Sequence, residues 1–484
     1  MFWEVFGKKS IFVLHMPKKI IIIGAGPAAL SAGKILSEQK DTEIEVYEKE
    51  NKPGGLAASF TFRNQIVDLG PHRFFTHDNK VCEFWLNASH GSTSKVSRLT
   101  RIFYKNKFFR YPLKPFEALW KLGIGPSFSV ILSYLRQKIN PEKDIGNFEG
   151  WVSRRFGRKL FRIFFKTYSE KLWGLECNKL DADFASQRIK KLSLASAVFS
   201  AFSFKKTKHK TLVDEFDYPK KGAGSVYENL VKEMKEQKVD FHFGQTINGV
   251  RINEGKVEGI LHEDGSFIKS DHVISTMPID QLIQNSDGID PAIVEQSKKL
   301  KFRNTILVYA LIPENTLFPD QWLYIHNTNT DSGRISNFRN WVPELYGDEK
   351  GSILCLEYWC NNDDELWNAD DKEFEKMAFK DLIKTGLNKG LDVVEFKVVR
   401  LQDSYPVYFY GYKEVLKPIV DYLKNIEGLH LIGRGGSYKY NNQDHSIKMG
   451  LLLADNLVNN AGHDLWSVNT DFDSYQEGTK AERE

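Results

Sequence analysis

The sequence predicts an α/β protein with a parallel sheet and two long insertions, one helical and one of antiparallel strands. The first observation is a run of four isoleucines at 20–23 that leads into the glycine-rich turn GAGPAAL and then into a helical pattern. Four apolar residues are too few for a helix and match a strand covered on both faces. The second observation is the length of 484 residues, which exceeds one typical core and indicates two or three domains.

The turn after the first strand has the spacing of a dinucleotide-binding fingerprint. Gly24 is expected to make the tight turn, and Gly26 to let the backbone approach a pyrophosphate. Ala29 replaces the third glycine, which the fingerprint allows, and the free N–H groups of the following helix favour phosphate. A second strand, EIEVYEKE, carries Glu48, 22 residues past Gly26, where an acidic residue binds ribose hydroxyl groups. Together these features predict a dinucleotide site.

Composition excludes several classes of protein. Hydrophobic residues make up 41% and charged residues 27% of the chain, as in an ordinary globular protein, and a formal net charge of +4 is too small to imply nucleic acid. The four cysteines form neither a metal-binding pair nor a disulfide framework, which fits a reducing, cytoplasmic setting. The sequence contains no run of about 18 apolar residues, so no transmembrane helix is predicted. Residues 1–15 lack a signal-peptide cleavage site and are interpreted as an N-terminal extension.

The stretch after Glu48 distinguishes between dinucleotides. NKPGGLAASF at 51–60 places a glycine doublet after the ribose-binding acid, and NQIVDLGPHRFF follows at 64–75. This order resembles the FAD-binding superfamily of amine oxidases, protoporphyrinogen oxidases, carotenoid desaturases and UDP-galactopyranose mutases, so it implies FAD rather than NAD. The FAD-binding residues implied by the fingerprint and the resemblance are Gly24, Gly26, Pro27, Ala28, Glu48, Gly54, Gly55, Leu56, Gly70, Pro71, Arg434, Asn442, Gln443 and Asp444.

The predicted architecture is a discontinuous Rossmann-type FAD-binding domain with an inserted helical domain and an antiparallel β-sheet substrate domain. Long insertions of this kind are tolerated because the entropy of loop closure grows slowly with length. The expected parts are an N-terminal extension (1–15), the FAD-binding domain (16–75, 211–280 and 395–465), a mainly helical insertion with a mobile loop (76–210), the substrate domain (281–394) and a C-terminal tail (466–484).

Patterns inside the insertions predict individual elements. Strands of the substrate domain are expected at 304–312, 321–327 and 352–360. A helix is expected at 151–165, with Val152, Phe156, Leu160, Ile163 and Phe164 on one face and basic residues opposite. A membrane-surface helix is one interpretation, but a solvated helix packed in a domain or dimer interface is favoured.

No second dinucleotide fingerprint is predicted. The glycine-containing stretches at 123–128 and 222–227 are not expected to lie between a buried strand and a helix. The chain therefore has no separate nicotinamide domain, and an external reductant such as NAD(P)H would have to bind without one.

Several stretches resemble UDP-galactopyranose mutases specifically, and this resemblance extends from about residue 17 to 460. GPHRFFTHDNKVCEFW at 70–85 is similar to the segment that passes under the flavin, and 166–194 is similar to a mobile loop whose arginine grips the pyrophosphate. The stretches at 321–338 and 404–408 are similar to those that supply further diphosphate-binding groups. The implied catalytic residues are Arg188, Arg334 and His72, and the implied substrate-binding residues are Trp322, Tyr324, Tyr405 and Tyr440.

The stretch IGRGGSYKYNNQDHSIKMG at 432–450 places many hydrogen-bonding side chains ahead of a helical pattern. Asp444 or Ser446 is expected to cap this helix. A helix N-terminus carries partial positive charge. In the resembling family it points at the pyrimidine end of the flavin, where a reduced, anionic flavin benefits from it.

The resemblance implies a flavin-dependent nucleotide-sugar mutase that acts on a UDP-sugar. In that family N5 of reduced FAD attacks the anomeric carbon, and two arginines stabilise the departing diphosphate. An FAD-dependent oxidoreductase of the amine oxidase or protoporphyrinogen oxidase type is the alternative, because it shares the FAD-binding part. A non-catalytic, membrane-associated flavoprotein is a third hypothesis and rests only on the basic helix at 151–165. A homo-oligomer is left open, and no nucleic acid or transmembrane partner is expected.

Overall fold

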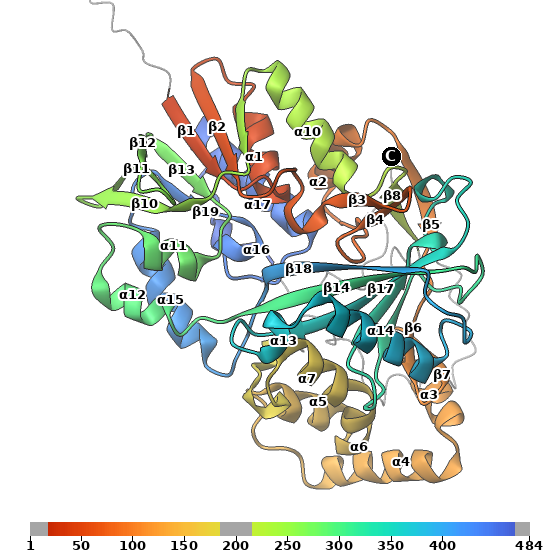
Figure 1. The fold of residues 1–484 in the computed structure, drawn as a ribbon. Helices are drawn as coiled ribbons and strands as arrows, with labels where there is room; N and C mark the ends of the chain where they lie inside the picture. Colours follow the sequence, from red (N-terminus) through yellow and green to blue (C-terminus); the bar gives the residue numbers. More distant parts are fainter. Residues whose placement is uncertain (1–17, 184–214, 470–484) are drawn as a thin grey trace, which may run out of the picture.

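A five-stranded parallel sheet occupies one end of the molecule, at the upper left of Figure 1. The computed structural model describes residues 18–183 and 215–469, and in it the strand order is β19-β13-β1-β2-β9. The strands are β1 (Lys18–Ile23), β2 (Thr42–Glu48), β9 (Asp240–Phe243), β13 (His272–Ser275) and β19 (Leu429–Leu431). All neighbours pair in parallel, and the four isoleucines of β1 are buried. The predicted Rossmann-type α/β fold is confirmed.

Three helices pack beside this sheet and direct two N-termini to the same region. They are α1 (Pro27–Leu36), α10 (Gly224–Glu236) and α17 (Gln443–Asn459). α1 and α17 touch so closely that a Cβ atom on Gly450 would lie 2.4 Å from the carbonyl oxygen of Ala28. A smaller antiparallel sheet and its helices lie beyond, namely β10 (Ile247–Asn253), β11 (Lys256–His262), β12 (Phe267–Lys269), α11 (Ile279–Asn285), α12 (Pro291–Ser297) and α15 (Tyr412–Leu423).

A seven-stranded sheet, ordered β18-β14-β17-β16-β15-β6-β7, forms the second half of the molecule (Figure 1). Its strands are β6 (Thr100–Tyr104), β7 (Lys107–Arg110), β14 (Phe302–Ile312), β15 (Trp322–Ile325), β16 (Arg334–Asn337), β17 (Ser352–Cys360) and β18 (Glu395–Pro406). Three of them, β14, β15 and β17, are the predicted strands of the substrate domain. Helix α14 (Asp371–Thr385) packs its buried Phe374, Ala378 and Leu382 into the same core as these strands.

Some strands pair with strands outside the domain to which the sequence analysis assigned them. β18 begins at the boundary expected at 395, but it pairs with β14 and not with the parallel sheet. β6 and β7 lie in the insertion expected to be mainly helical, yet β6 pairs with β15. The glycine stretch at 222–227 does lie between a strand, β8 (Glu215–Pro219), and α10, contrary to the prediction. However, β8 pairs antiparallel with β5 (Thr93–Ser97), so no second parallel dinucleotide unit results.

Further α-helices and a π-helical turn lie between these elements. They are α2 (Asn79–Ala88), α3 (Pro115–Leu122), α4 (Ile124–Ile139), α5 (Phe148–Phe156), α6 (Arg158–Phe161), a π-helical turn (Arg162–Lys166), α7 (Thr167–Trp173), α13 (Glu365–Asn368) and α16 (Gly433–Gly436). A hairpin of β3 (Ser59–Phe62) and β4 (Gln65–Asp68) joins the two halves. Within the described ranges, none of the helices is long and apolar enough to cross a membrane.

The single helix predicted at 151–165 is wrong. Gly157 has φ +84, a left-handed conformation that glycine adopts without strain, and it separates α5 from α6. A Cβ atom there would lie 2.9 Å from the backbone nitrogen of Tyr134 in α4, so the break also allows α4 to approach. Val152, Phe156 and Leu160 are buried in the core. This segment therefore offers no apolar face to a membrane.

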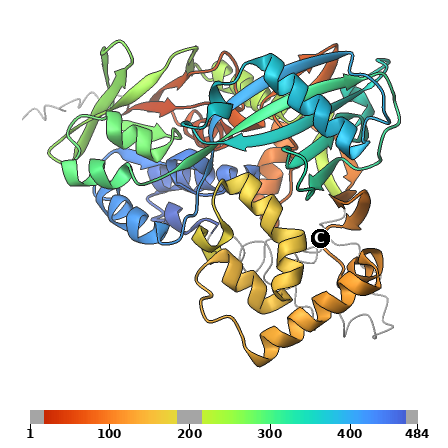
Figure 2. The same ribbon diagram turned by 60° about the horizontal axis from the view of Figure 1, so that its bottom comes forward.

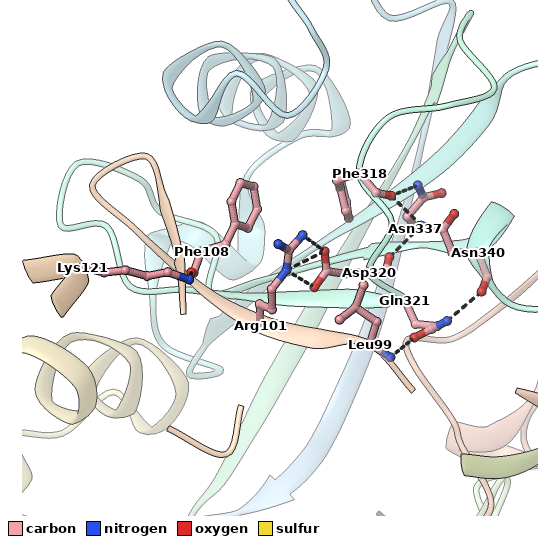
Figure 3. A network of polar contacts seen from close by, with 9 residues as sticks. All are labelled: Leu99, Arg101, Phe108, Lys121, Phe318, Asp320, Gln321, Asn337 and Asn340. Carbon is pink, nitrogen blue, oxygen red and sulfur yellow. Dashed lines mark hydrogen bonds and ion pairs between the residues drawn. The ribbon is translucent and has the colours of Figure 1, made fainter. Parts of the chain in front are cut away.

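Buried polar contacts fasten the β6–β7 hairpin to β15 (Figure 3). Arg101 on β6 donates from Nε and Nη2 to both carboxylate oxygens of Asp320, at 2.9 and 2.6 Å, and its guanidinium lies 4.2 Å from the ring centre of Phe108. The Asp320 side chain is fully buried. Beside it, Gln321 accepts from the backbone N–H of Leu99 at 2.7 Å. These contacts set the position of β15, which carries two of the predicted substrate-binding residues.

We predict that Arg101→Leu lowers the free energy of unfolding by about 3–5 kcal/mol, because it leaves the Asp320 carboxylate buried and unpaired. Denaturant titration followed by circular dichroism measures this loss. Asp287→Asn is the control, since it removes an exposed ion pair with Arg251 and is expected to cost less than about 1 kcal/mol. Equal effects of the two substitutions would show that the Arg101 contact is not a buried charge pair.

Candidate functional site

A cavity of about 800 Å³ lies between the parallel sheet and the seven-stranded sheet. It brings together most of the residues predicted for the site. Lining it are Gly24, Gly26, Pro27, Ala28, Glu48, Gly55, Leu56, Pro71, His72, Trp322, Tyr324, Arg334, Arg434, Tyr440, Asn442 and Gln443. Gly70 and Tyr405 line a smaller adjoining cavity of about 90 Å³. Gly54 and Asp444 line neither, and Arg188 lies outside the described residues.

The glycine turn after β1 leaves room in front of a helix N-terminus. Gly24 has φ +101, and a Cβ atom there would lie 2.1 Å from Oγ1 of Thr276. At Gly26 a Cβ atom would meet nothing within 4 Å, because that position faces the cavity. α1 begins at the next residue, and no side chain caps its N-terminus. Open space beside uncapped backbone N–H groups suits a pyrophosphate.

The glycine doublet is joined to the first turn. The backbone N–H of Gly54 donates to the carbonyl oxygen of Ala25 at 2.8 Å. A Cβ atom on Gly55 would lie 3.3 Å from Cα of Gly26, so this approach requires a glycine. The doublet thus forms a wall of the same pocket, and Gly54 contributes by its position and not by lining the cavity.

Glu48 at the end of β2 is held in one orientation. Its Oε2 accepts from the backbone N–H of Ala25 at 2.6 Å, and its Oε1 accepts from the backbone N–H of Glu50 at 2.9 Å. The side chain is 7% exposed, and burial raises its pKa. Each carboxylate oxygen can accept a further hydrogen bond, and Glu48 lines the cavity, so it can bind two ribose hydroxyl groups.

Arg334 on β16 forms a forked ion pair with Glu357 on the neighbouring strand β17. Nε of the arginine donates to Oε1 and Nη2 to Oε2. The arginine side chain is 14% exposed and the glutamate side chain 1%. Burial lowers the pKa of Arg334, but Glu357 more than offsets this and the pKa lies well above its usual value. The arginine is therefore permanently charged and fixed in direction at the cavity wall.

Two aromatic rings lie beside a second arginine of the site, Arg434. Tyr405 and Tyr440 stack with ring centres 5.2 Å apart, and the Arg434 guanidinium lies 5.1 Å from each ring centre. Arg434 donates to the carbonyl oxygens of Asn441 and Ser404, which fixes its position. Hydroxyl groups and a fixed arginine on the same wall suit an anionic ligand better than an apolar one.

Comparison with known proteins follows from this geometry. The model of the flavin containing amine oxidoreductase family matches residues 30–442. The chain belongs to this family. Family membership makes the protein a flavoprotein, and the glycine turn and the Glu48 carboxylate that line the cavity fit FAD.

Relatives of known activity fall into two groups. Coproporphyrinogen III oxidase of Staphylococcus aureus is 23% identical over 84% of this chain and 92% of that protein. The dTDP-fucopyranose mutase of Escherichia coli is 22% identical over 49% of this chain, and a probable UDP-galactopyranose mutase of Klebsiella pneumoniae is 26% identical over 34%. The chain spans only 59% and 43% of those two mutases.

Solved structures share the whole fold. A reduced UDP-galactopyranose mutase superimposes with a TM-score of 0.81 at 21% identity, covering 94% of this chain and 98% of that one. A putative protoporphyrinogen oxidase from Exiguobacterium gives a TM-score of 0.71 at 14% identity, covering 91% and 98%. At these identities the likeness shows the fold alone.

The N-terminus of α17 lines the same cavity with Asn442, Gln443 and Ser446. Its cap is Asn442 and not Asp444 or Ser446: the Asn442 side chain accepts from the backbone of His445, whose ring Nδ1 accepts from the Asn442 N–H at 3.3 Å. Gln443 is fixed as well, because its Oε1 accepts from the hydroxyl of Tyr227 at 2.6 Å. The cap turns the positive end of the helix toward the cavity.

His72 lines the cavity as a neutral imidazole. Its Nε2 lies 2.9 Å from the carbonyl oxygen of Leu69, which can only accept, so Nε2 carries the proton. Burial, together with the smaller effect of the nearby Arg434 and Arg334 charges, lowers its pKa to about 4. At neutral pH, His72 therefore offers an unprotonated Nδ1 and not a positive charge.

The sequence analysis missed several residues of the site. Arg98 and Tyr111 line the cavity. The ring centre of Tyr324 lies 4.8 Å from that of Tyr111 and 5.3 Å from that of Tyr168. Their positions arise from tertiary contacts and carry no local motif. Glu357 did carry a signal, because it is a single carboxylate within the otherwise apolar strand SILCLEYWC.

We predict that Glu48→Gln weakens FAD binding about 10- to 100-fold, because a charge-assisted acceptor for the ribose is lost. Flavin fluorescence titration of the deflavinated protein measures the dissociation constant. Glu43→Gln, on the same strand but exposed at its other end, is the control and should bind FAD like the wild type. Unchanged affinity in Glu48→Gln would mean that the ribose lies elsewhere.

Proposed function

We propose that this flavoprotein is a nucleotide-sugar mutase, which interconverts the pyranose and furanose forms of a nucleoside diphosphate sugar with no net redox change. The observation that carries this proposal is the fixed charge of Arg334 at a cavity wall that also presents Tyr324 and Tyr440. An amine or polyene substrate would instead favour an apolar wall. The whole-chain likeness to a UDP-galactopyranose mutase structure supports the proposal.

The bound flavin, when reduced, supplies the nucleophile for the anomeric carbon. Arg334 stabilises the diphosphate as the bond between the sugar and the phosphate oxygen breaks. Glu357 occupies the Nε side of the guanidinium, and the five N–H donors of arginine leave the Nη1 edge for phosphate. The glutamate thus orients the arginine before the substrate arrives, so little reorganisation is needed as charge develops.

Further residues of the site are assigned roles in binding the substrate. The hydroxyl groups of Tyr324, Tyr405 and Tyr440 donate to phosphate oxygens without adding charge. Trp322, buried on β15, forms part of the wall for the base or the sugar. His72, which is neutral, accepts a hydrogen bond from the flavin or sugar at Nδ1. We assign Arg188 as the second diphosphate arginine on a closing loop, on the resemblance alone.

The nucleotide is either UDP or dTDP. Of the two mutase relatives, one is a dTDP-fucopyranose mutase and the other a probable UDP-galactopyranose mutase. We expect catalysis in the cytoplasm, where NAD(P)H or another external reductant keeps the flavin reduced.

Oxidation is the second candidate function. The coproporphyrinogen III oxidase match covers 92% of that protein, which is more of the relative than either mutase match covers. An oxidase would share the FAD pocket, and its substrate carboxylates would also pair with Arg334. The two functions differ in their need for oxygen and for reduced flavin.

One experiment separates the two candidates. The purified holoprotein is reduced with dithionite without oxygen and given UDP-galactofuranose or dTDP-fucofuranose, and the pyranose products are separated by chromatography. The oxidised holoprotein is given coproporphyrinogen III, and oxygen uptake is recorded. Sugar turnover only in the reduced state supports the mutase. Oxygen-consuming turnover without any sugar conversion would refute it.

We predict that Arg334→Lys lowers kcat/KM for the nucleotide sugar about 100-fold, because lysine keeps the charge opposite Glu357 but loses the second donor edge. Flavin content, read from the visible spectrum, should stay at the wild-type level. Arg339→Lys is the control, because Arg339 donates to backbone carbonyls away from the cavity. Loss of flavin in Arg334→Lys would place this residue in the cofactor site instead.

A further inference from the structure

Helix α4 exposes its apolar side to solvent. Apolar residues recur every three to four positions along this helix and form one stripe. They are Ile124, Phe128, Ile131, Leu132, Leu135 and Ile139. Ile124 is 93% exposed, Ile139 85% and Phe128 68%. On α3, Phe116 and Trp120 extend the same kind of surface, at 70% and 81% exposed. Apolar surface gathered in this way marks an interaction site, whereas scattered apolar residues do not.

The opposite side of α4 is polar and faces the protein. The hydroxyl of Ser127 donates to the carbonyl oxygen of Leu119 in α3, and the hydroxyl of Ser133 accepts from the backbone N–H of Lys159 at 3.0 Å. Gln137 is 7% exposed and accepts from the backbone N–H of Glu142 at 2.9 Å. These contacts fix the rotation of α4 about its axis. The apolar stripe therefore points away from the protein.

The chain around this stripe is strongly basic. Residues 105–166 contain 14 Lys and Arg against 4 Asp and Glu, a net charge of +10 within a chain whose formal charge is only +4. By helical geometry, Arg136 and Lys138 flank the apolar stripe on its two sides, and both are exposed. Arg110, Lys114 and Lys143 are exposed near the two ends of the helix pair.

We infer that α3 and α4 bind the protein to the surface of a membrane that contains anionic lipid. Apolar side chains of this size enter the headgroup region, while flanking Lys and Arg attract anionic headgroups. α4 lies at the edge of the molecule farthest from the parallel sheet in both views, so nothing in the described chain blocks its approach to a flat surface (Figures 1 and 2). A second copy is a poorer occupant, because a symmetric contact would bring two basic surfaces together.

Vesicle flotation with the full-length holoprotein tests this inference. Vesicles of two parts phosphatidylcholine to one part phosphatidylglycerol are expected to carry the protein upward, and vesicles of phosphatidylcholine alone to carry at least about tenfold less. Added salt should weaken the binding, since it screens the charges. Quenching of tryptophan fluorescence by brominated acyl chains should occur in the wild type and decrease in Trp120→Phe.

A matched pair of variants locates the contact. Phe128→Ser/Leu135→Ser is expected to reduce flotation about tenfold or more. The control is Phe379→Ser/Ile383→Ser, which alters exposed apolar residues on α14 and should float like the wild type. Flavin content verifies that both variants fold.

Three results would overturn the inference. They are absence of flotation with anionic vesicles, equal loss of flotation in both double variants, and a dimer in analytical ultracentrifugation that dissociates in Phe128→Ser/Leu135→Ser without any vesicle binding by the wild type. The last result would assign the stripe to a second copy of the chain.

Discussion

The buried ion pair between Arg334 and Glu357 is the interaction on which the proposed chemistry depends. Taking two charges out of water is costly, and the cost is recovered only when both partners are well bonded. The antiparallel pairing of β16 with β17 sets the two residues opposite each other, and the fork geometry satisfies both carboxylate oxygens. Glu357 therefore fixes which edge of Arg334 faces the cavity and keeps the guanidinium charged.

The rest of the fold places this pair at the border of the cavity. The glycine turn, Glu48 and the N-terminus of α17 belong to the parallel-sheet half of the molecule, whereas Arg334 and Tyr324 belong to the seven-stranded sheet. The cavity lies where the parallel-sheet half and the seven-stranded-sheet half pack together. The β3–β4 hairpin and the Arg101–Asp320 contact contribute to that packing, since both fix strands that border the cavity.

The sequence predicted best those site residues whose role depends on their neighbours in the chain. Gly24, Gly26 and Glu48 follow from the requirements of one turn and one strand end, and the buried strands follow from apolar runs. It failed where the outcome depends on partners distant in the chain. The break at Gly157 interrupts an apolar period that continues on both sides of it. Nothing local indicates that β18 pairs with β14. Periodicity does not tell which face of a helix meets the protein, and the apolar stripe of α4 is exposed.

The most direct measurement follows the bond between the sugar and the diphosphate. UDP-galactopyranose carrying a heavy oxygen isotope in the bridging position is incubated with the flavin-loaded protein, and phosphorus NMR locates the label. With reduced flavin, the account predicts that the label spreads to the non-bridging positions of the β-phosphate, because the bond breaks and re-forms while UDP stays bound. With oxidised flavin the label should not move. A label that stays in the bridging position with reduced flavin would contradict the account.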